Sequence, residues 1–464
     1  MKPSIQSVLS AARRKPLAAC FAALFALAAP EAIAANTWTV TTCADSGPGS
    51  LRAVIATPTT LSGDTVDLST LSCSTISLTT GAITITQNSL NIQGPSRHEV
   101  ITGYYNGVTE NDRIFKHTGT GTLTLQYLNF MYANFAPASG DASGGCIYSK
   151  GNVFLMDSLV FSCATKTSGN AIARGGGIYT LGKLTTKYSQ ISGNTATGYL
   201  SGGGGAFVGH TFRAEHSTIN GNRAAGSHGV GGGIEVGYGA NIINSTISGN
   251  IASQEDGGMY VGGDATTDTL QINSSTISGN VAQTGRIGGV GTTLPTTVQN
   301  STIAFNTAAT THFSGSTDYR APGLAVLNSY SATSLAVNLQ SSILSNNTYG
   351  TIEGDFSAVV HTGHTVTITS ANSLIRASLG PQHPATVTTS CPLLGPLRAN
   401  GGPTQTHALM SRSPAIDAGN NAAGLTGDQR GTAYARVSGS AADIGAYEVQ
   451  QNDIIFNSGF DGCP

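Results

Sequence analysis

The sequence predicts an all-β protein, a single right-handed parallel β-helix built from repeats of roughly 28 residues. Three observations predict it: a short phrase that returns at nearly constant spacing, glycine-rich bends between its copies, and an unusual composition. Charged residues make up only 10% of the chain, against about 25% in an average soluble domain. Glycine accounts for 60 of the 464 residues, which favours many short strands joined by tight turns.

The recurring phrase is Ser, then Thr or Gln, then Ile, with Asn three positions further on. Its clearest copies are spaced 28, 28, 30 and 26 residues apart and end at Asn194, Asn222, Asn250, Asn280 and Asn306. Self-similarity with a period of roughly 20 to 50 residues marks a repeat architecture, and a propeller blade would need about 40 residues. Apolar and polar residues alternate within the phrase, as in strands. Each repeat therefore predicts one coil, and the crossover rule for parallel strands predicts the right hand.

Equivalent residues of successive coils are expected to stack into columns spaced by about 4.8 Å. The isoleucines of the phrase should form an aliphatic ladder inside, and the residue before each isoleucine should point outward. The asparagines can hydrogen-bond from coil to coil, so we interpret them as a turn ladder rather than a ligand site. A second phrase, Gly-Gly-X followed by an apolar residue, separates the copies and begins at Gly144, Gly175, Gly203, Gly231 and Gly257.

Aligning the glycine phrases places five residues in one outward column: Tyr148, Tyr179, Phe207, Glu235 and Tyr260. Aromatic rings spaced by the height of a coil can offer their faces to sugar rings, so the four aromatic members of this column are candidate glycan-stacking residues. The alternative is an aromatic ladder that only covers the sheet.

Residues 1–35 are typical of a secretory signal peptide. A basic stretch at 13–15 precedes an apolar run at 17–29, and small residues lead to a cleavage position near Ala35 or Asn36. The apolar run is too short to span a bilayer. We expect a mature chain without a transmembrane segment, either secreted or held at the cell surface or outer membrane of a Gram-negative bacterium.

The mature chain would keep an even number of cysteines, which predicts disulfides in an oxidising compartment. Proximity in the sequence favours Cys43 with Cys73 and Cys146 with Cys163, and leaves Cys391 with Cys463. The alternative is a set of unpaired buried thiols. The sequence has neither a Cys-X-X-Cys motif nor a Cys/His cluster, so we expect no metal site.

Several motifs resemble known families. The two recurring phrases resemble the repeats of polymorphic outer membrane proteins, although that family often has Phe three residues before the Asn, where this chain mostly has Ile. The C-terminal motifs are similar to the end of choice-of-anchor Q domain proteins: Leu-Gly-Pro-Leu-Arg-Ala-Asn-Gly-Gly-Pro-Thr-Gln-Thr-His at 394–407, Ser-Pro-Ala-Ile-Asp-Ala-Gly-Asn at 413–420, Asp-Gln-Arg-Gly at 428–431 and Asp-Ile-Gly-Ala-Tyr-Glu at 443–448. Asp-Ser-Gly-Pro-Gly-Ser-Leu-Arg-Ala-Val-Ile at 45–55 is similar to their first segment.

This resemblance covers about 36–448 and implies a pectate-lyase-like β-helix outside the cell or on its surface, without implying a defined reaction. We expect five parts: a signal peptide at 1–35, an N-terminal cap with the first coils at 36–100, the β-helix repeats at 101–390, a choice-of-anchor Q-like end at 391–448, and a short tail at 449–464. The end at 391–448 would form the last turns and the closing cap, because open β-helix ends expose strand edges.

Composition and motifs favour binding or structure over catalysis. A net charge of -2 gives no basic field for nucleic acid, and no phosphate loop or other motif predicts a cofactor. Glu255, Asp256, Asp264 and Asp268 are a candidate acidic cluster, which with Arg286 would suit a calcium-dependent lyase. The alternative is a set of solvated turn residues.

We therefore predict no catalytic residues and favour a non-catalytic adhesive or structural stalk that also binds glycans. Its partner would be a polysaccharide or a component of a host or cell surface. The runner-up is a polysaccharide lyase or a glycoside hydrolase of the pectate-lyase-like superfamily.

Overall fold

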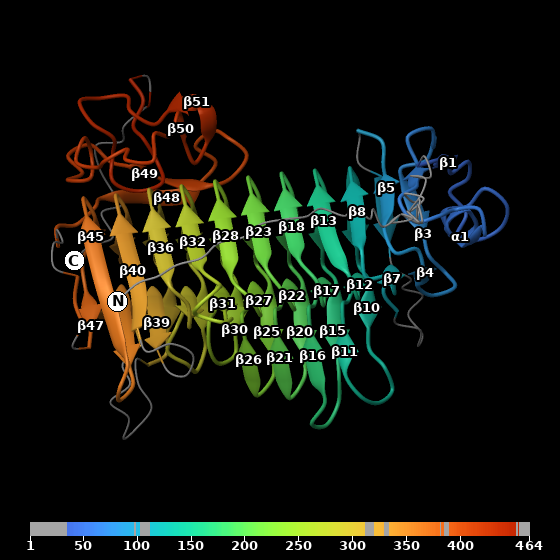
Figure 1. Ribbon diagram of the computed structural model, residues 1–464, viewed down its shortest axis with the longest axis horizontal. Coiled ribbons are helices and arrows are strands. Elements are labelled where there is room, and N and C mark those ends of the chain that lie inside the picture. The colour runs from blue at the N-terminus through green and yellow to red at the C-terminus, as the bar shows by residue number, and fades with distance from the viewer. Residues whose placement is uncertain are drawn as a thin grey trace, which may run out of the picture. The chain divides into compact units, whose positions relative to one another are not determined.

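The computed structural model describes residues 35–96, 99–102, 112–310, 320–328, 334–380, 382–384, 389–451 and 453. These residues form a parallel β-helix with one short α-helix, which confirms the predicted fold (Figure 1). Residues 1–34 of the predicted signal peptide and most of the predicted tail lie outside the described residues. In the described part of the chain, no helix is long and apolar enough to cross a membrane.

Successive coils build three long sheets. In the described residues sheet A has 12 strands, and sheets B and C have 11 strands each. Two shorter sheets, D with 9 strands and E with 4, lie where the chain passes from sheet B to sheet C. One complete coil runs in turn through β13 (Asn152–Met156, sheet A), β14 (Leu159–Phe161, sheet B), β15 (Ala164–Lys166, sheet D), β16 (Ile172–Arg174, sheet E) and β17 (Ile178–Thr180, sheet C).

The predicted aliphatic ladder fills the interior. Its isoleucines are buried and pair in register from coil to coil, at Ile191, Ile219, Ile247, Ile277 and Ile303. The isoleucines thus give each coil the same inward face, which explains why the phrase returns at the spacing of one coil.

The asparagine column is a continuous hydrogen-bonded ladder, as predicted. The Nδ2 group of Asn194 donates to Oδ1 of Asn222 at 2.9 Å, and the backbone N–H of Asn194 donates to the same oxygen at 3.0 Å. The same two bonds join each later pair of asparagines. The last amide, that of Asn347, donates to the carboxyl of Asp355 at 2.8 Å. All these side chains are buried and hydrogen-bonded, so the column has a structural role.

The corner between sheets A and B is made by a residue in the left-handed region. The φ angle is 48° at Tyr188, His216 and Asn244, although none of them is glycine. A buried serine follows each corner, and the backbone N–H of Ser189 donates to Oγ of Ser217 in the next coil at 3.2 Å. The serine column therefore helps to hold a conformation that is unfavourable on its own.

The bend that leads into sheet C requires glycine. Gly175, Gly203 and Gly231 have φ angles of 59°, 58° and 61°. A Cβ at Gly203 would lie 2.0 Å from the backbone oxygen of Ala206, and the other two bends are similarly crowded. A side chain at this position is therefore strained.

At the N-terminal end, α1 (Leu51–Ala56) packs against β2 (Thr65–Asp67) and β4 (Ile83–Ile85). Ser50 caps the helix, and the two apolar side chains of its inner face join the hydrophobic core. The helix therefore covers apolar surface of the first coils.

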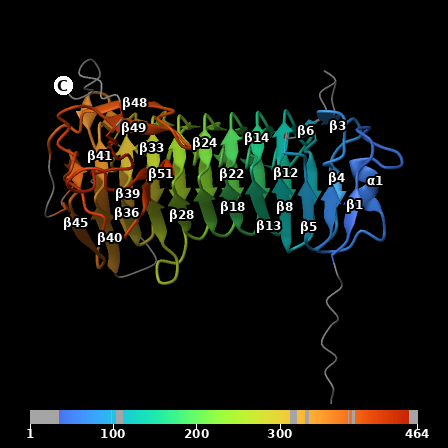
Figure 2. The ribbon, with the colours of Figure 1, turned by 90° about the horizontal axis from the view of Figure 1, so that it is seen from above.

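The stretch that we expected to form the last turns instead folds back along the side of the coils. β48 (Leu394–Arg398) and β49 (Thr406–Leu409) pair antiparallel with each other, beside β33 (Thr276–Ser278) and β41 (Ile343–Ser345) of sheet B (Figure 2). A second hydrophobic core lies between this segment and the outer face of sheet B. It contains Ala304, Ile343, Leu374, Leu394, Leu409, Ala415, Ile444 and Tyr447.

Buried polar contacts fix the same interface. Gln429 donates from Nε2 to Oγ1 of Thr246 at 2.9 Å, and its Oε1 accepts from Oγ1 of Thr276 at 2.6 Å. His407 Nε2 lies 2.8 Å from Oγ of Ser278, and burial lowers the pKa of this histidine to about 4. The threonines thus point outward as predicted, but towards the C-terminal segment and not towards solvent.

Disulfides join Cys43 to Cys73 and Cys146 to Cys163, which confirms both predicted pairs. Cys391 is also disulfide-bonded, whereas Cys463 lies outside the described residues.

Candidate functional site

The predicted aromatic column lies on the outer face of sheet C. Its members pair in register on β12 (Ile147–Ser149), β17, β22 (Ala206–Val208), β27 (Ile234–Val236) and β31 (Met259–Val261), in the order Tyr148, Tyr179, Phe207, Glu235 and Tyr260.

The first three rings of the column stack on one another. The rings of Tyr148 and Tyr179 lie 5.4 Å apart with an interplanar angle of 3°, and those of Tyr179 and Phe207 lie 5.0 Å apart at 9°. Arg113 lies over Tyr148 at 5.3 Å, and Arg174 lies over Phe207 at 4.9 Å. Both faces of Tyr179 are occupied by its neighbours, so its ring faces are not free to stack on a sugar. The glycan-stacking role of Tyr148, Phe207 and Tyr260 stays a prediction.

Glu235 interrupts the column where a neighbouring strand leaves room. Its Oε2 lies 1.7 Å from the place that a Cβ on Gly202 would occupy, at the end of β21 (Leu200–Gly202) in sheet E. Burial raises the pKa of the Glu235 carboxyl to about 7, although the charge of Arg174 opposes the shift. A substantial fraction of this side chain is therefore protonated at neutral pH.

Asp256 stands where the preceding coils have the bend glycine. Its φ angle is 59°, equal to that of Gly175. Its Oδ1 lies 1.9 Å from the place that a Cβ on Gly291 would occupy, in β35 (Val290–Thr292). The residue is only 4% exposed, and its Oδ1 has no hydrogen-bond partner among the described residues. A strained and buried carboxyl without a partner at this oxygen lowers stability, which is typical of functional positions.

An ion pair lies beside Asp256. Glu255 Oε1 is 2.9 Å from Nε of Arg286 and 3.9 Å from a guanidinium nitrogen of Arg320. Burial, reinforced by the charge of Glu255, raises the pKa of Asp256 well above its ordinary value, while the two arginines oppose this. Burial also raises the pKa of Tyr260, and the neighbouring carboxyls add to the shift. We call these residues the carboxyl site: Glu235, Glu255, Asp256, Tyr260, Arg286 and Arg320.

The four acids predicted as one cluster are divided between two places. Glu255 and Asp256 precede β31, whereas Asp264 and Asp268 follow it, in the loop before β32 (Leu270–Asn273). Oδ2 of Asp268 accepts from the backbone N–H of Asp264 at 2.8 Å, so the second pair closes its own loop. The single cluster is therefore not formed, and in the described ranges no group of three or more His, Cys, Asp or Glu is placed to hold a metal ion.

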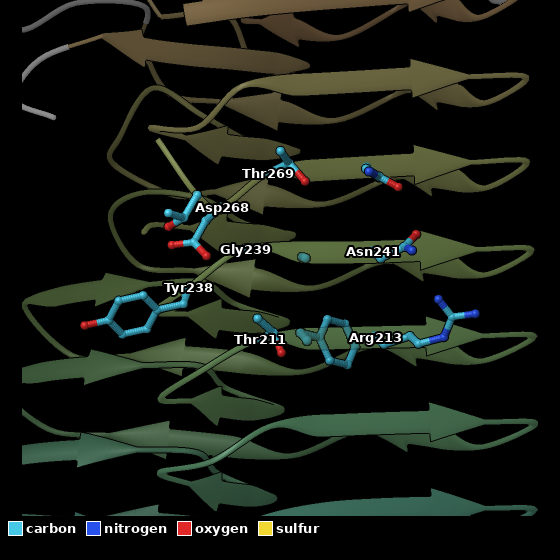
Figure 3. A pocket seen from close by; sticks show the side chains of 11 residues that line it. Thr211, Arg213, Tyr238, Gly239, Asn241, Asp268 and Thr269 are labelled. Carbon is cyan, nitrogen blue, oxygen red and sulfur yellow. The ribbon is translucent and has the colours of Figure 1, made fainter. Parts of the chain in front are cut away.

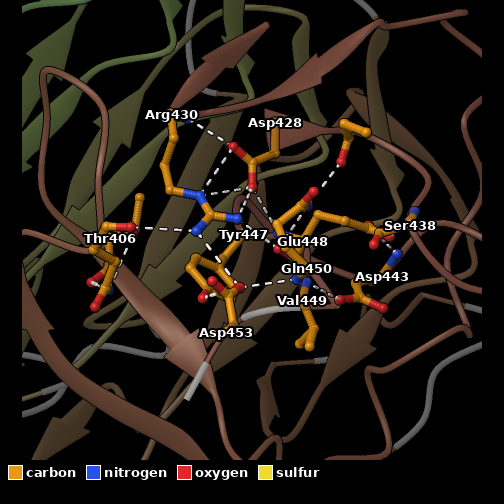
Figure 4. Close-up of polar contacts among 12 residues, drawn as sticks. Thr406, Asp428, Arg430, Ser438, Asp443, Tyr447, Glu448, Val449, Gln450 and Asp453 are labelled. Atoms are coloured by element: carbon orange, nitrogen blue, oxygen red, sulfur yellow. Dashed lines mark hydrogen bonds and ion pairs between the residues drawn. The ribbon is translucent and has the colours of Figure 1, made fainter. Parts of the chain in front are cut away.

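The residues of the C-terminal motifs form a buried polar network inside the C-terminal segment (Figure 4). Arg430 pairs with Asp428 at 2.8 Å, with both side chains fully buried, and its guanidinium lies 3.9 Å from the ring centroid of Tyr447. Glu448 accepts from two backbone N–H groups, one of them that of Asp443 at 2.7 Å. Because these groups satisfy one another, the motifs fix the fold of the segment and are not free for chemistry.

No family model matches the chain, and no curated protein matches it. The chain is similar to the crystal structure of the pectate lyase Pel9A, with 15% identity and a TM-score of 0.39, over 89% of this chain and 96% of that one. The resemblances to choice-of-anchor Q proteins and to polymorphic outer membrane proteins stay predictions.

Proposed function

We propose that the protein is an exported carbohydrate-active enzyme that cleaves a glycosidic bond at the carboxyl site, with Glu235 as the proton donor. The observation that carries the proposal is that two residues of the same coil region depart from the pattern of the repeat. Within one short stretch an acid interrupts an aromatic stack, and a second acid replaces a bend glycine. Natural sequences depart from local consistency mainly at functional sites.

Glu235 has the proton affinity that a general acid needs. A pKa of about 7 keeps much of the carboxyl protonated at neutral pH and still lets it release the proton. In the proposed step the proton moves from Glu235 to the glycosidic oxygen as the bond between that oxygen and the anomeric carbon breaks. Water then supplies hydroxide to the anomeric carbon and returns a proton to Glu235. This step needs no metal or redox partner.

In this proposal Asp256 acts on the charges around the site and does not transfer the proton. The charge of Glu235 contributes to the raised pKa of Asp256, after burial and the charge of Glu255. Tyr260 follows Glu235 in the column, and the charges of both acids add to the raised pKa of its hydroxyl. The proposal therefore assigns Asp256 a positioning role and reserves proton transfer for Glu235, which is only partly buried.

The test is a depolymerisation screen on neutral and uronic-acid polysaccharides. New reducing ends are measured beside the ultraviolet absorbance of unsaturated products, because only an elimination yields the latter. We expect hydrolysis that falls by roughly 100-fold or more in Glu235→Gln, while the matched variant Asp157→Asn, at a corner with φ of 45° far along the chain, keeps full activity. Activity that is unchanged in Glu235→Gln would refute the assignment.

The adhesive or structural stalk remains the second candidate, and the continuous asparagine ladder favours it. A rigid solenoid with hydrogen-bonded columns is suited to holding surfaces apart. If no polysaccharide is cleaved, this role becomes the better explanation. Both candidates place the protein outside the cytoplasm, at the cell surface or secreted, which the signal-like N-terminus and the two disulfides support.

A further inference from the structure

A hollow of about 270 Å³ lies on the outer face of sheet A, on a different sheet from the carboxyl site. It spans β23 (Phe212–Glu215), β28 (Ala240–Ile243) and β32. Figure 3 shows Arg213 and Asn241 on neighbouring strands, with Tyr238 and Asp268 at the loops where the chain enters them. Gly239 has a φ angle of 74° and lines the hollow. A Cβ at this position would crowd Asp268 and Thr269.

An unsatisfied acceptor lines this hollow. Arg213, Asn241 and Gln271 are register partners and form a short polar column along the sheet. Oδ1 of Asn241 is buried, and none of the residues that the structure describes donates a hydrogen bond to it. Buried polar atoms are nearly always hydrogen-bonded. The amide of Asn241 therefore lacks an internal donor among the described residues, and rotation about its terminal bond would turn this acceptor into the hollow.

The charges around the hollow are already compensated. The guanidinium of Arg213 lies 3.4 Å from the carboxylate of Glu215, and Asp268 accepts a hydrogen bond from the backbone of its own loop. Neither a strong anion nor a cation has a dedicated partner here. Amide, hydroxyl and guanidinium groups beside the half-exposed ring of Tyr238 instead match a molecule rich in hydroxyl groups with an apolar face.

We propose that this hollow is a saccharide-binding subsite that takes one uncharged sugar residue. A sugar hydroxyl would donate to Oδ1 of Asn241, and the ring of Tyr238 at the rim would contact the apolar face of the sugar. The subsite would hold the polymer independently of the carboxyl site and does not depend on the proposed cleavage.

The experiment is isothermal titration of the full chain with cellohexaose, xylohexaose and maltohexaose, with hexagalacturonate as the charged comparison. The protein carries Glu235→Gln, so that cleavage of the probes cannot mimic binding. We expect at least one neutral oligosaccharide to bind, and its affinity to fall roughly tenfold or more in Asn241→Leu and in Tyr238→Ala. The control is Tyr199→Ala, which removes another exposed tyrosine, 42% exposed against 48% for Tyr238, and should bind unchanged.

Thermal unfolding of each variant checks the fold. If Asn241→Leu does not fold, the surface variant Tyr238→Ala carries the test alone. The proposal is overturned if no neutral probe binds, if only hexagalacturonate binds, or if Tyr238→Ala binds as tightly as the parent. Loss of cleavage in Glu235→Gln with neutral binding retained would support both sites, whereas neutral binding without any cleavage by the unmodified chain would refute the cleavage proposal alone.

Discussion

The asparagine ladder and the carboxyl site both bury polar side chains, yet they are built in opposite ways. An amide carries both donors and an acceptor, so Asn222 can donate to Asn250 and to the backbone oxygen of Ile191 and also accept from Asn194. A carboxylate only accepts, and two stacked carboxylates repel. Acids therefore cannot repeat from coil to coil, and Glu235 and Asp256 each occur once, in space left by a glycine of a neighbouring strand. The difference separates a structural column from a candidate functional site.

The largest effect is expected from breaking the ladder. Asn250 makes four side-chain hydrogen bonds, to both neighbouring asparagines and to the backbone oxygen of Ile219. Asn250→Ala leaves several of these buried partners unsatisfied and should destabilise the fold by about 3 kcal/mol. Urea unfolding measures the loss, and Asn220→Ala, on the outer side of sheet B, is the control. A change below about 0.5 kcal/mol at Asn250 would show that the ladder contributes little.

Asp256→Gly should stabilise the fold, in contrast to Asn250→Ala. It restores the glycine of the other coils at φ of 59° and removes a buried carboxyl, so stability should rise by about 1 kcal/mol or more. Chemical denaturation measures the gain, and any cleavage activity should fall at the same time. Destabilisation would mean that the side chain mainly fills the space over Gly291, and the functional interpretation of Asp256 would then be wrong.

The aromatic run should behave as packing. Tyr179→Leu removes a ring stacked on both sides and should cost about 1 kcal/mol. Because its faces are covered, oligosaccharide binding in the same titration should not change. Weaker binding in this variant would restore the original prediction that sugars stack along the column.

The last comparison is a pH dependence of stability. The pKa of Glu235 rises from 4.5 to about 7 on folding, so its contribution is fully present below about pH 4.5 and is lost as the pH rises through about 7. The wild type should therefore gain stability relative to Glu235→Gln on going from about pH 8 to about pH 5. His407 and Asp355 titrate in both proteins and cancel in the comparison. An equal pH dependence in both would contradict the raised pKa.

The repeat made much of this protein predictable. A coil contacts mainly the coils before and after it, so a column such as Tyr148, Tyr179 and Phe207 can be aligned from sequence spacing alone. The same alignment also identifies a residue that departs from the pattern, because Glu235 is the acid in an otherwise aromatic column. What could not be predicted was the orientation of the rings, which depends on how they stack on one another, and the burial of that acid beside Gly202 of sheet E.

The coil, its inward isoleucines, its asparagine ladder and two disulfides follow from the amino-acid pattern, because each depends on residues one coil or less apart. The position of the C-terminal segment, in contrast, follows from long-range packing. Gln429 meets Thr246 across 183 residues of sequence, and no local pattern encodes that contact. The same holds for the carboxyl site and for the hollow beside Asn241. Their chemistry depends on burial and on which groups remain unsatisfied, and these are properties of the packed chain.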